Sequence, residues 1–170
     1  MLVNIYGPAH YDRKLEFLEE IQNKVLSSEF PILLGGDFNL VRKVEEKSSG
    51  NVDVQLMEAF NDMINTTSLR ELHRIGSRYT WTNKQNPPIM CVLDRVLVSN
   101  AWEDKFDLSI VVTTPRLGSD HNPILLDTGD ILVLKQYYFR FSAHWLNQPG
   151  FRDWVQSKWP TRYKFDPLDH

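Results

Sequence analysis

The stretch that decides the fold reads Pro31-Ile32-Leu33-Leu34-Gly35-Gly36-Asp37-Phe38-Asn39. Its apolar first half predicts a buried strand over 31–36, closed by the two glycines. Asp37 and Asn39 are two residues apart at the end of this strand, so we expect their side chains to point the same way. A carboxylate can hold a hard metal ion or a water molecule, and an amide can grip a phosphoryl oxygen without adding negative charge. The same residues also favour an Asx-type turn with a purely structural role.

Around this stretch, short apolar segments alternate with two amphipathic ones. Asp12 is placed to cap a helix over 13–28, and Asp53 is placed to cap a second helix whose Leu56, Phe60 and Ile64 fall on one face. The expected strands are 3–6, 31–36, 69–72, 79–82, 92–98, 107–113 and 123–127, with one or two helical turns at 100–105. Strands that alternate with helices predict an α/β (or α+β) fold with mixed sheet direction.

Composition narrows the class of protein. A chain of 170 residues with 42% hydrophobic residues is long and apolar enough for one globular domain. The net charge of −3 is not that of an avid nucleic-acid binder, although the tail over 131–170 is basic. Cys91 is the only cysteine, which excludes a disulfide within the chain and a cysteine-based zinc site. We find no signal peptide and no membrane-spanning segment, and so expect an intracellular protein, nuclear or cytoplasmic.

A second polar cluster, Gly118-Ser119-Asp120-His121-Asn122-Pro123, precedes an apolar run. An adjacent Asp and His at a strand edge offer a metal-binding or basic carboxylate beside an imidazole that titrates near neutrality. The structural alternative is a polar turn ended by Pro123.

The third cluster is Leu93-Asp94-Arg95, in which Asp94 lies within an apolar strand. A buried carboxylate needs a partner, because its desolvation costs several kcal/mol. His121 is a good candidate, since a carboxylate on one ring nitrogen fixes the tautomer. A contact of Asp94 with Arg95 or with the backbone is the structural alternative.

In this order the three clusters resemble the endonuclease/exonuclease/phosphatase (DNase I-like) family of metal-dependent phosphodiesterases. The motifs are G-D-F-N at Asp37 and Asn39, L-D-R at Asp94, and S-D-H-x-P at Asp120 and His121. Two further segments, 4–8 and 79–82, resemble the family's tyrosine-bearing strand and the aromatic strand ahead of L-D-R. Within the family, the chain is most similar to the endonuclease of plant LINE-type (non-LTR) retrotransposons.

The resemblance implies a four-layer sandwich of two mixed β-sheets flanked by helices, of which this chain is the C-terminal part. Residues 1–129 would form the partial endonuclease domain. Residues 130–170 are rich in aromatic side chains and resemble the segment that leads to a reverse transcriptase.

The resemblance also implies a role for each site residue. Asp37 would orient or deprotonate the attacking water, and Asp94 would orient His121. The scissile phosphate would be held by Tyr6, Asn39 and His121, with His121 also stabilising the developing negative charge. Asp120 would help to place Mg²⁺ or Mn²⁺. Trp81 and Arg95 are candidate DNA contacts, although a strand tryptophan is also a common core residue.

One departure from the family concerns its first half. The resemblance calls for a first half that begins with a strand bearing Asn, followed by a Glu that is a principal metal ligand. This half is lacking here, and no glutamate stands ahead of Tyr6. We therefore expect a first sheet that is incomplete, weak metal binding, and self-association through an exposed sheet face. The leading hypothesis is a truncated metal-dependent DNA endonuclease of a LINE-like element. The alternatives are an inactive remnant that at most binds nucleic acid or protein, and a phosphodiesterase acting on a phosphoinositide or sphingolipid.

Overall fold

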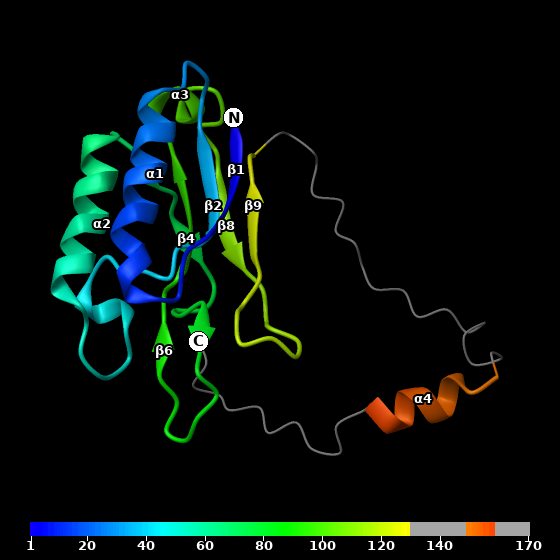
Figure 1. Ribbon diagram of the computed structural model, residues 1–170. Coiled ribbons are helices and arrows are strands. Elements are labelled where there is room, and N and C mark those ends of the chain that lie inside the picture. Colours follow the sequence, from blue (N-terminus) through cyan, green and yellow to red (C-terminus); the bar gives the residue numbers. More distant parts are fainter. Residues whose placement is uncertain (130–148, 159–170) are drawn as a thin grey trace. The chain divides into compact units, whose positions relative to one another are not determined.

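The structure is a computed structural model that describes residues 1–129 and 149–158 (Figure 1). The chain divides into two units, Met1–Leu132 and Val133–His170. Within the described part of the second unit, Phe151–Lys158 forms helix α4. The rest of the aromatic segment expected at 130–170 lies outside the described residues. Among the described residues, no helix combines the length and the apolar character that crossing a bilayer requires.

The first sheet has the strand order β1-β2-β7-β3. β1 (Leu2–Tyr6) runs parallel to β2 (Leu33–Asp37), and β7 (Asp94–Val98) runs antiparallel to both β2 and the short β3 (Arg70–Glu71). The strand predicted at 31–36 is thus present, shifted so that it ends on Asp37. β1 is an edge strand of this sheet, and Leu2 and Tyr6 on it are 70% and 84% exposed.

Two helices cover one face of the first sheet. α1 (Lys14–Leu26) and α2 (Val54–Thr66) pack together with the strand residues Ile5, Leu34 and Leu97 in one apolar core (Figure 1). The Asp53 side chain accepts a hydrogen bond from the Leu56 amide, which confirms the predicted cap. The predicted cap at Asp12 is wrong, because a 3₁₀ turn over Tyr11–Arg13 precedes α1 and takes up that residue.

The opposite face of the first sheet packs against a second sheet of order β4-β8-β9. β4 (Arg74–Ile75) is parallel to β8 (Ile110–Thr113), which is antiparallel to β9 (Ile124–Asp127). Leu33, Val96 and Val98 form the core between the sheets with Val111 of β8, and Trp102 of the short helix α3 (Asn100–Glu103) packs against it. Both sheets are mixed, and helices cover the first of them, which confirms the predicted α/β class.

A hairpin completes the described fold. β5 (Trp81–Thr82) pairs antiparallel with β6 (Met90–Cys91), and the bridge between Lys47 and Cys91 joins β6 to the loop after β2. β4 and β6 are only two residues long and were not expected from the sequence.

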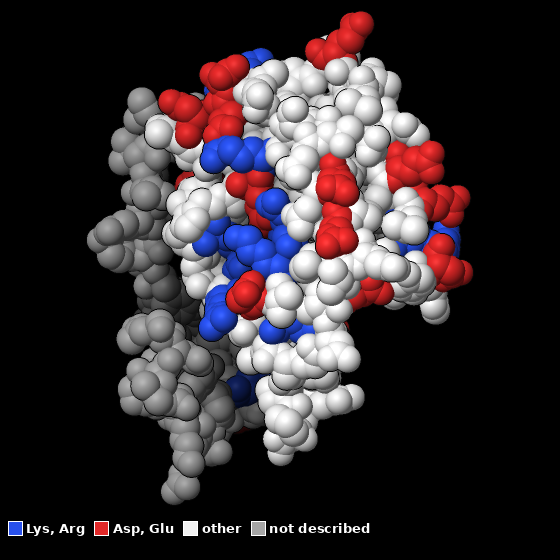
Figure 2. Space-filling view, turned by 90° about the vertical axis from the view of Figure 1, so that its left-hand side faces the viewer, with Lys and Arg blue, Asp and Glu red and all other residues white. Residues whose placement is uncertain are grey.

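Charge is unevenly distributed over the surface. In the view of Figure 2, lysine and arginine side chains gather in the middle of the face, with carboxylates on either side and a few among them. The net charge of −3 belongs to the whole chain and does not show how positive and negative side chains are arranged on this face.

Candidate active site

Three neighbouring strands bring polar side chains to one end of the first sheet. Tyr6 ends β1, Asp37 ends β2, and Asp94 begins β7. Tyr6 is the register partner of Asp37, and Asp37 is the register partner of Asp94. Register partners point to the same side of a sheet, so the three side chains share the face that carries the inter-sheet core.

The glycines of the central motif allow β1 to approach. Gly36 has φ of +139°, and a Cβ on it would collide with the Ile5 carbonyl oxygen of β1. A Cβ on Gly7 would collide with the Phe38 carbonyl, while the Gly7 amide donates to the Asp37 carbonyl at 2.6 Å. Only glycine fits such close backbone contacts, so these residues hold Tyr6 beside Asp37.

Asn39 does not continue the alternation of the strand. Its φ of +53° folds it back, and its amide N–H donates to Asp37 Oδ1 at 2.8 Å. This is the Asx-type turn left open by the sequence. Asn39 Nδ2 donates to the Gly7 carbonyl at 3.0 Å and to Asp37 Oδ2 at 3.3 Å, and Lys14 Nζ donates to the Asn39 carbonyl at 2.6 Å. The alternation predicted for Asn39 is therefore absent, but its side chain still contacts that of Asp37, and both residues line one pocket.

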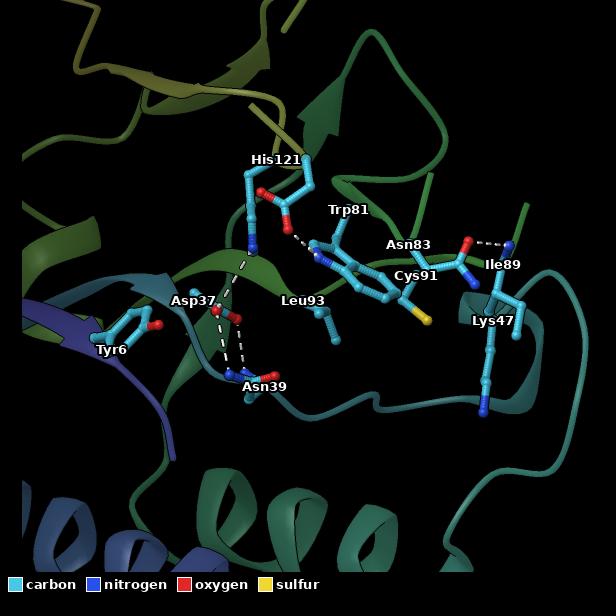
Figure 3. A pocket seen from close by; sticks show the side chains of 11 residues that line it. Tyr6, Asp37, Asn39, Lys47, Trp81, Asn83, Ile89, Cys91, Leu93 and His121 are labelled. Atoms are coloured by element: carbon cyan, nitrogen blue, oxygen red, sulfur yellow. Dashed lines mark hydrogen bonds and ion pairs between the residues drawn. The ribbon is translucent and has the colours of Figure 1, made fainter. Parts of the chain in front are cut away.

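His121 contacts both Asp37 and Asp94, and Figure 3 shows its ring directed toward Asp37. Its Nδ1 is 2.9 Å from Asp94 Oδ2, and its Nε2 is 3.9 Å from Asp37 Oδ2. The contact predicted between Asp94 and His121 is therefore present. Because Asp94 accepts the hydrogen bond, Nδ1 of His121 carries a proton. The other ring nitrogen, Nε2, then faces Asp37, which lines the pocket.

Burial raises the pKa of Asp37 above its ordinary value, and the negative charge of Asp94 acts in the same direction. The hydrogen bond from the Asn39 amide and the charges of His121 and Lys14 oppose this increase without cancelling it. Asp37 is 8% exposed, so the desolvation has a clear structural origin. A carboxylate with a raised pKa is a stronger base than an ordinary aspartate.

The loop that carries Asp120 and His121 is attached to β5. The Thr82 amide donates to the Asp120 carbonyl at 3.0 Å, and an isolated bridge joins Trp81 to His121. The Trp81 indole N–H donates to Asp120 Oδ2 at 3.0 Å. This hydrogen bond is the main reason why the pKa of the exposed Asp120 lies below its ordinary value. The buried residue Thr80, next to β5, links this region to β7, because its Oγ1 accepts a hydrogen bond from the Asp94 amide at 3.0 Å.

A pocket of about 420 Å³ opens over these groups. Of the residues named as candidates from the sequence, those that line it are Tyr6, Asp37, Asn39, Trp81, Asp120 and His121 (Figure 3). Sequence reasoning missed the remaining lining residues, which are Lys47, Asn83, Ile89, Cys91 and Leu93. They come from the β5–β6 hairpin and the segments paired with it, and no periodic signal in the sequence marks them.

The prediction that Arg95 contacts DNA is wrong, because the residue is buried. Its side chain is 1% exposed and lies on the helix-covered face of β7, because successive strand residues alternate between faces. Its guanidinium contacts Glu46 and Glu71 and passes over the Phe60 ring, 5.5 Å from the centroid. Arg95 therefore does not reach a surface where DNA could bind.

The described residues do not fit a metal ion well. Within ranges 1–129 and 149–158, no three His, Cys, Asp or Glu side chains are grouped so that they could hold one. The carboxylates that line the pocket are Asp37 and Asp120, and Asp120 already accepts the indole N–H of Trp81. A hard cation prefers a larger set of oxygen ligands.

The fold is that of a DNase I-like α/β protein, and an Asp–His–Asp array stands near the ends of its strands. Residues 1–125 match the family described as Endonuclease-reverse transcriptase, and the chain belongs to this family. No curated protein sequence gave a significant match.

Two solved structures share the fold. Beta toxin from Staphylococcus aureus aligns with a TM-score of 0.53 at 15% identity, over 74% of this chain and 51% of that one. The endonuclease domain of TRAS1, a telomere-specific non-LTR retrotransposon, aligns with a TM-score of 0.50 at 17% identity, over 73% of this chain and 54% of that domain. The chain therefore spans about half the length of each structure.

Proposed function

We propose that this chain supplies catalytic residues of an endonuclease that hydrolyses phosphodiester bonds in DNA. The observation that carries the proposal is the Asp94–His121–Asp37 array, with contacts of 2.9 Å and 3.9 Å, in which His121 and Asp37 line the pocket and Asp94 supports His121. Membership of the Endonuclease-reverse transcriptase family supports it independently. We propose that the chain belongs to the endonuclease of a LINE-like retroelement of plant type, and that it acts in the nucleus or the cytoplasm.

In this proposal Asp37 accepts a proton from the attacking water as the water oxygen bonds to phosphorus and the bond to the leaving ester oxygen breaks. Its raised pKa suits this task. Asp94 holds the ring of His121, and the imidazolium Nε2–H donates to a phosphoryl oxygen that gains negative charge. Electrostatic stabilisation of this kind is a large term in phosphoryl chemistry.

Two further residues hold the phosphate. Tyr6 is 84% exposed at the end of β1 and lines the pocket, so its hydroxyl can donate to a phosphoryl oxygen. Asn39 Nδ2 reaches the phosphate by giving up its longer hydrogen bond to Asp37, at 3.3 Å. Asn39 thus has a second task, which is to hold Asp37 in place when no phosphate is bound.

Contact with DNA beyond the scissile phosphate is proposed for Trp81, whose ring lines the pocket and can stack on an unpaired base. Lys47 lines the pocket and supplies a positive charge, which favours a phosphate backbone. The segment 130–170, with its excess of basic residues, is proposed to lead toward a reverse transcriptase.

Mg²⁺ or Mn²⁺ is the ion that the family resemblance favours. The described part of the chain has no group of three ligands for such an ion, so we propose that it binds one weakly. When bound, a hard cation would neutralise charge on the phosphate, and no step above depends on it.

The test is nicking of supercoiled plasmid with Mg²⁺, comparing the wild-type chain with His121→Ala. His10→Ala is the matched control, because His10 is exposed and does not line the pocket. We expect nicking by wild type and His10→Ala, and a loss of about 10²-fold or more in His121→Ala. Equal rates in all three proteins would exclude the enzyme.

The small carboxylate set favours one alternative, an inactive protein that binds nucleic acid or protein. Duplex binding that survives in His121→Ala, without nicking by the wild type, would support this alternative. A phosphodiesterase of soluble inositol phosphates that leaves DNA intact would contradict both.

Self-association through the exposed part of the first sheet is also proposed. Its edge strand is β1, whose Leu2 and Tyr6 side chains are exposed on the sheet face, and an edge strand of this kind can pair with another chain. Sedimentation of the wild type and Leu2→Lys tests it, since a charge on an edge strand opposes pairing. A monomeric wild type at all concentrations would contradict it.

A further inference from the structure

The Arg95 guanidinium joins the two segments that carry the aspartates. Its Nη2 donates to the Leu40 carbonyl at 3.2 Å and to the Val92 carbonyl at 2.9 Å. Leu40 follows Asn39 directly, and Val92 stands two residues before Asp94. One nitrogen atom therefore ties the chain just after the Asp37 turn to the chain just before Asp94.

Carboxylates hold the guanidinium in this position. Arg95 Nη1 donates to both oxygens of Glu71, at 3.2 Å and 3.0 Å, and Nη2 donates to Glu46 Oε2 at 3.0 Å. Arg42 contacts the same two glutamates, through Nη1 to Glu71 at 2.8 Å and through its amide to Glu46 at 2.6 Å. Two arginines and two glutamates balance in charge within this cluster, so the buried Arg95 has ion-pair partners on the same face of the sheet.

The position of Arg95 beneath the sheet separates it from the substrate. Arg95 and Asp94 are successive residues of β7 and point to opposite faces. The Phe38 amide adds a backbone hydrogen bond to the Leu93 carbonyl at 2.9 Å. The two carbonyls that Arg95 contacts are close to this bond in sequence, because Leu40 follows Phe38 by two residues and Val92 precedes Leu93. The spacing of Asp37 and Asp94 thus depends on Arg95 as well as on the strand pairing.

We infer that Arg95 is a positioning residue, which sets the spacing of Asp37 and Asp94 and thereby the orientation and tautomer of the His121 ring. The inference concerns geometry that exists without substrate, but its importance for catalysis rests on the proposed function. A lysine cannot replace this arginine, because a single ammonium lacks the planar fork that reaches two carboxylates and two carbonyls together.

The experiment is nitrogen-15 NMR of the histidine rings of the whole chain, in alkaline buffer where imidazoles are neutral. His121→Gln identifies the His121 signals. In the wild type we expect the Nδ1–H tautomer to dominate by about tenfold or more, because hydrogen bonds to charged groups have that strength. In Arg95→Lys we expect the two tautomers to become comparable in population.

Arg70→Met is the matched control. It removes an arginine of β3 whose side-chain partner is Glu103 and which touches neither the Leu40 nor the Val92 carbonyl, so the tautomer should stay as in the wild type. If Arg95→Lys does not fold, Glu46→Gln replaces it, because this change weakens one anchor of Arg95 and should shift the tautomer in the same direction. A folded Arg95→Lys, or failing that Glu46→Gln, with the wild-type tautomer would overturn the inference.

Activity gives a second readout that separates the two proposals. If the nicking activity exists, Arg95→Lys should lower kcat by about 10-fold or more with little change in KM, because the substrate contacts remain. If the wild type does not nick DNA, the proposed function fails while the tautomer measurement still decides the role of Arg95.

Discussion

Asp37, the last residue of β2, is the register partner of Asp94, the first residue of β7. Two buried carboxylates face each other across neighbouring strands, and the His121 ring contacts both. One aspartate accepts a short hydrogen bond from the ring, and the other stands farther away with a raised pKa. The different surroundings of the two aspartates suit them to different tasks, one as orienter and one as base.

Asp94→Asn should lower the nicking rate by about 10²- to 10³-fold, the range for loss of one donor to the transition state, because the neutral amide no longer stabilises the imidazolium that donates to the phosphoryl oxygen. Asp62→Asn is the control, since Asp62 is exposed on α2 and far from the strand ends in sequence. Initial rates on supercoiled plasmid measure the effect. Comparable loss in both variants, or in neither, would contradict the role of Asp94.

Asp37→Asn should stabilise the fold at neutral pH while abolishing activity. The pKa of Asp37 is raised by burial, so the folded state binds this proton more tightly than the unfolded chain. The stability that the protonated carboxyl contributes is complete below the ordinary aspartate pKa and is lost as pH rises through the raised value. Urea unfolding from acid to neutral pH should therefore show the variant gaining relative to wild type across this window. A difference independent of pH would contradict the raised pKa.

Gly36→Ala should destabilise the protein by about 1–3 kcal/mol from backbone strain alone, with a further cost from the collision with the Ile5 carbonyl. Gly35→Ala is the matched control, because its added Cβ would meet only side-chain atoms of Leu33 and Val96, at 3.6 Å and 3.7 Å. Urea midpoints of the two variants measure the contrast. Equal destabilisation would mean that β1 does not depend on Gly36.

Trp81→Phe separates stacking from hydrogen bonding. Phenylalanine keeps an aromatic face but loses the N–H that donates to Asp120. If the ring stacks on a base, Trp81→Phe should bind a single-stranded oligonucleotide nearly as well as wild type, whereas Trp81→Ala should lose about 1–3 kcal/mol. Fluorescence anisotropy measures the affinities. Wild-type affinity in Trp81→Ala would remove stacking from the proposed function.

The sequence predicted the chemistry of the site better than its geometry. The pairing of Asp94 with His121 followed from the rule that a buried carboxylate needs a partner, and the 2.9 Å contact agrees with it. Asn39 departed from prediction because it lies beyond the strand, where a positive φ replaces the alternation. Arg95 could have been placed correctly, since alternation along β7 puts it opposite Asp94.

Other features had no local signal. β4 and β6 are two residues long, too short for a periodic pattern. β4 exists through pairing with the distant β8, and β6 exists through pairing with β5 across a hairpin. Lys47 and Cys91 enter the pocket through a bridge between segments far apart in the chain. Non-local pairing of this kind cannot be read from a window of neighbouring residues.

The contacts of His121 with both aspartates have a consequence for how the fold and the site support each other. Asp37 and Asp94 lie on neighbouring strands, whereas His121 comes from a loop that is attached to β5. The charge of Asp94 raises the pKa of Asp37, and the charge of His121 lowers it. A change that detaches this loop would leave two facing carboxylates without the group that offsets their repulsion, so the site and the stability of the fold would be lost together.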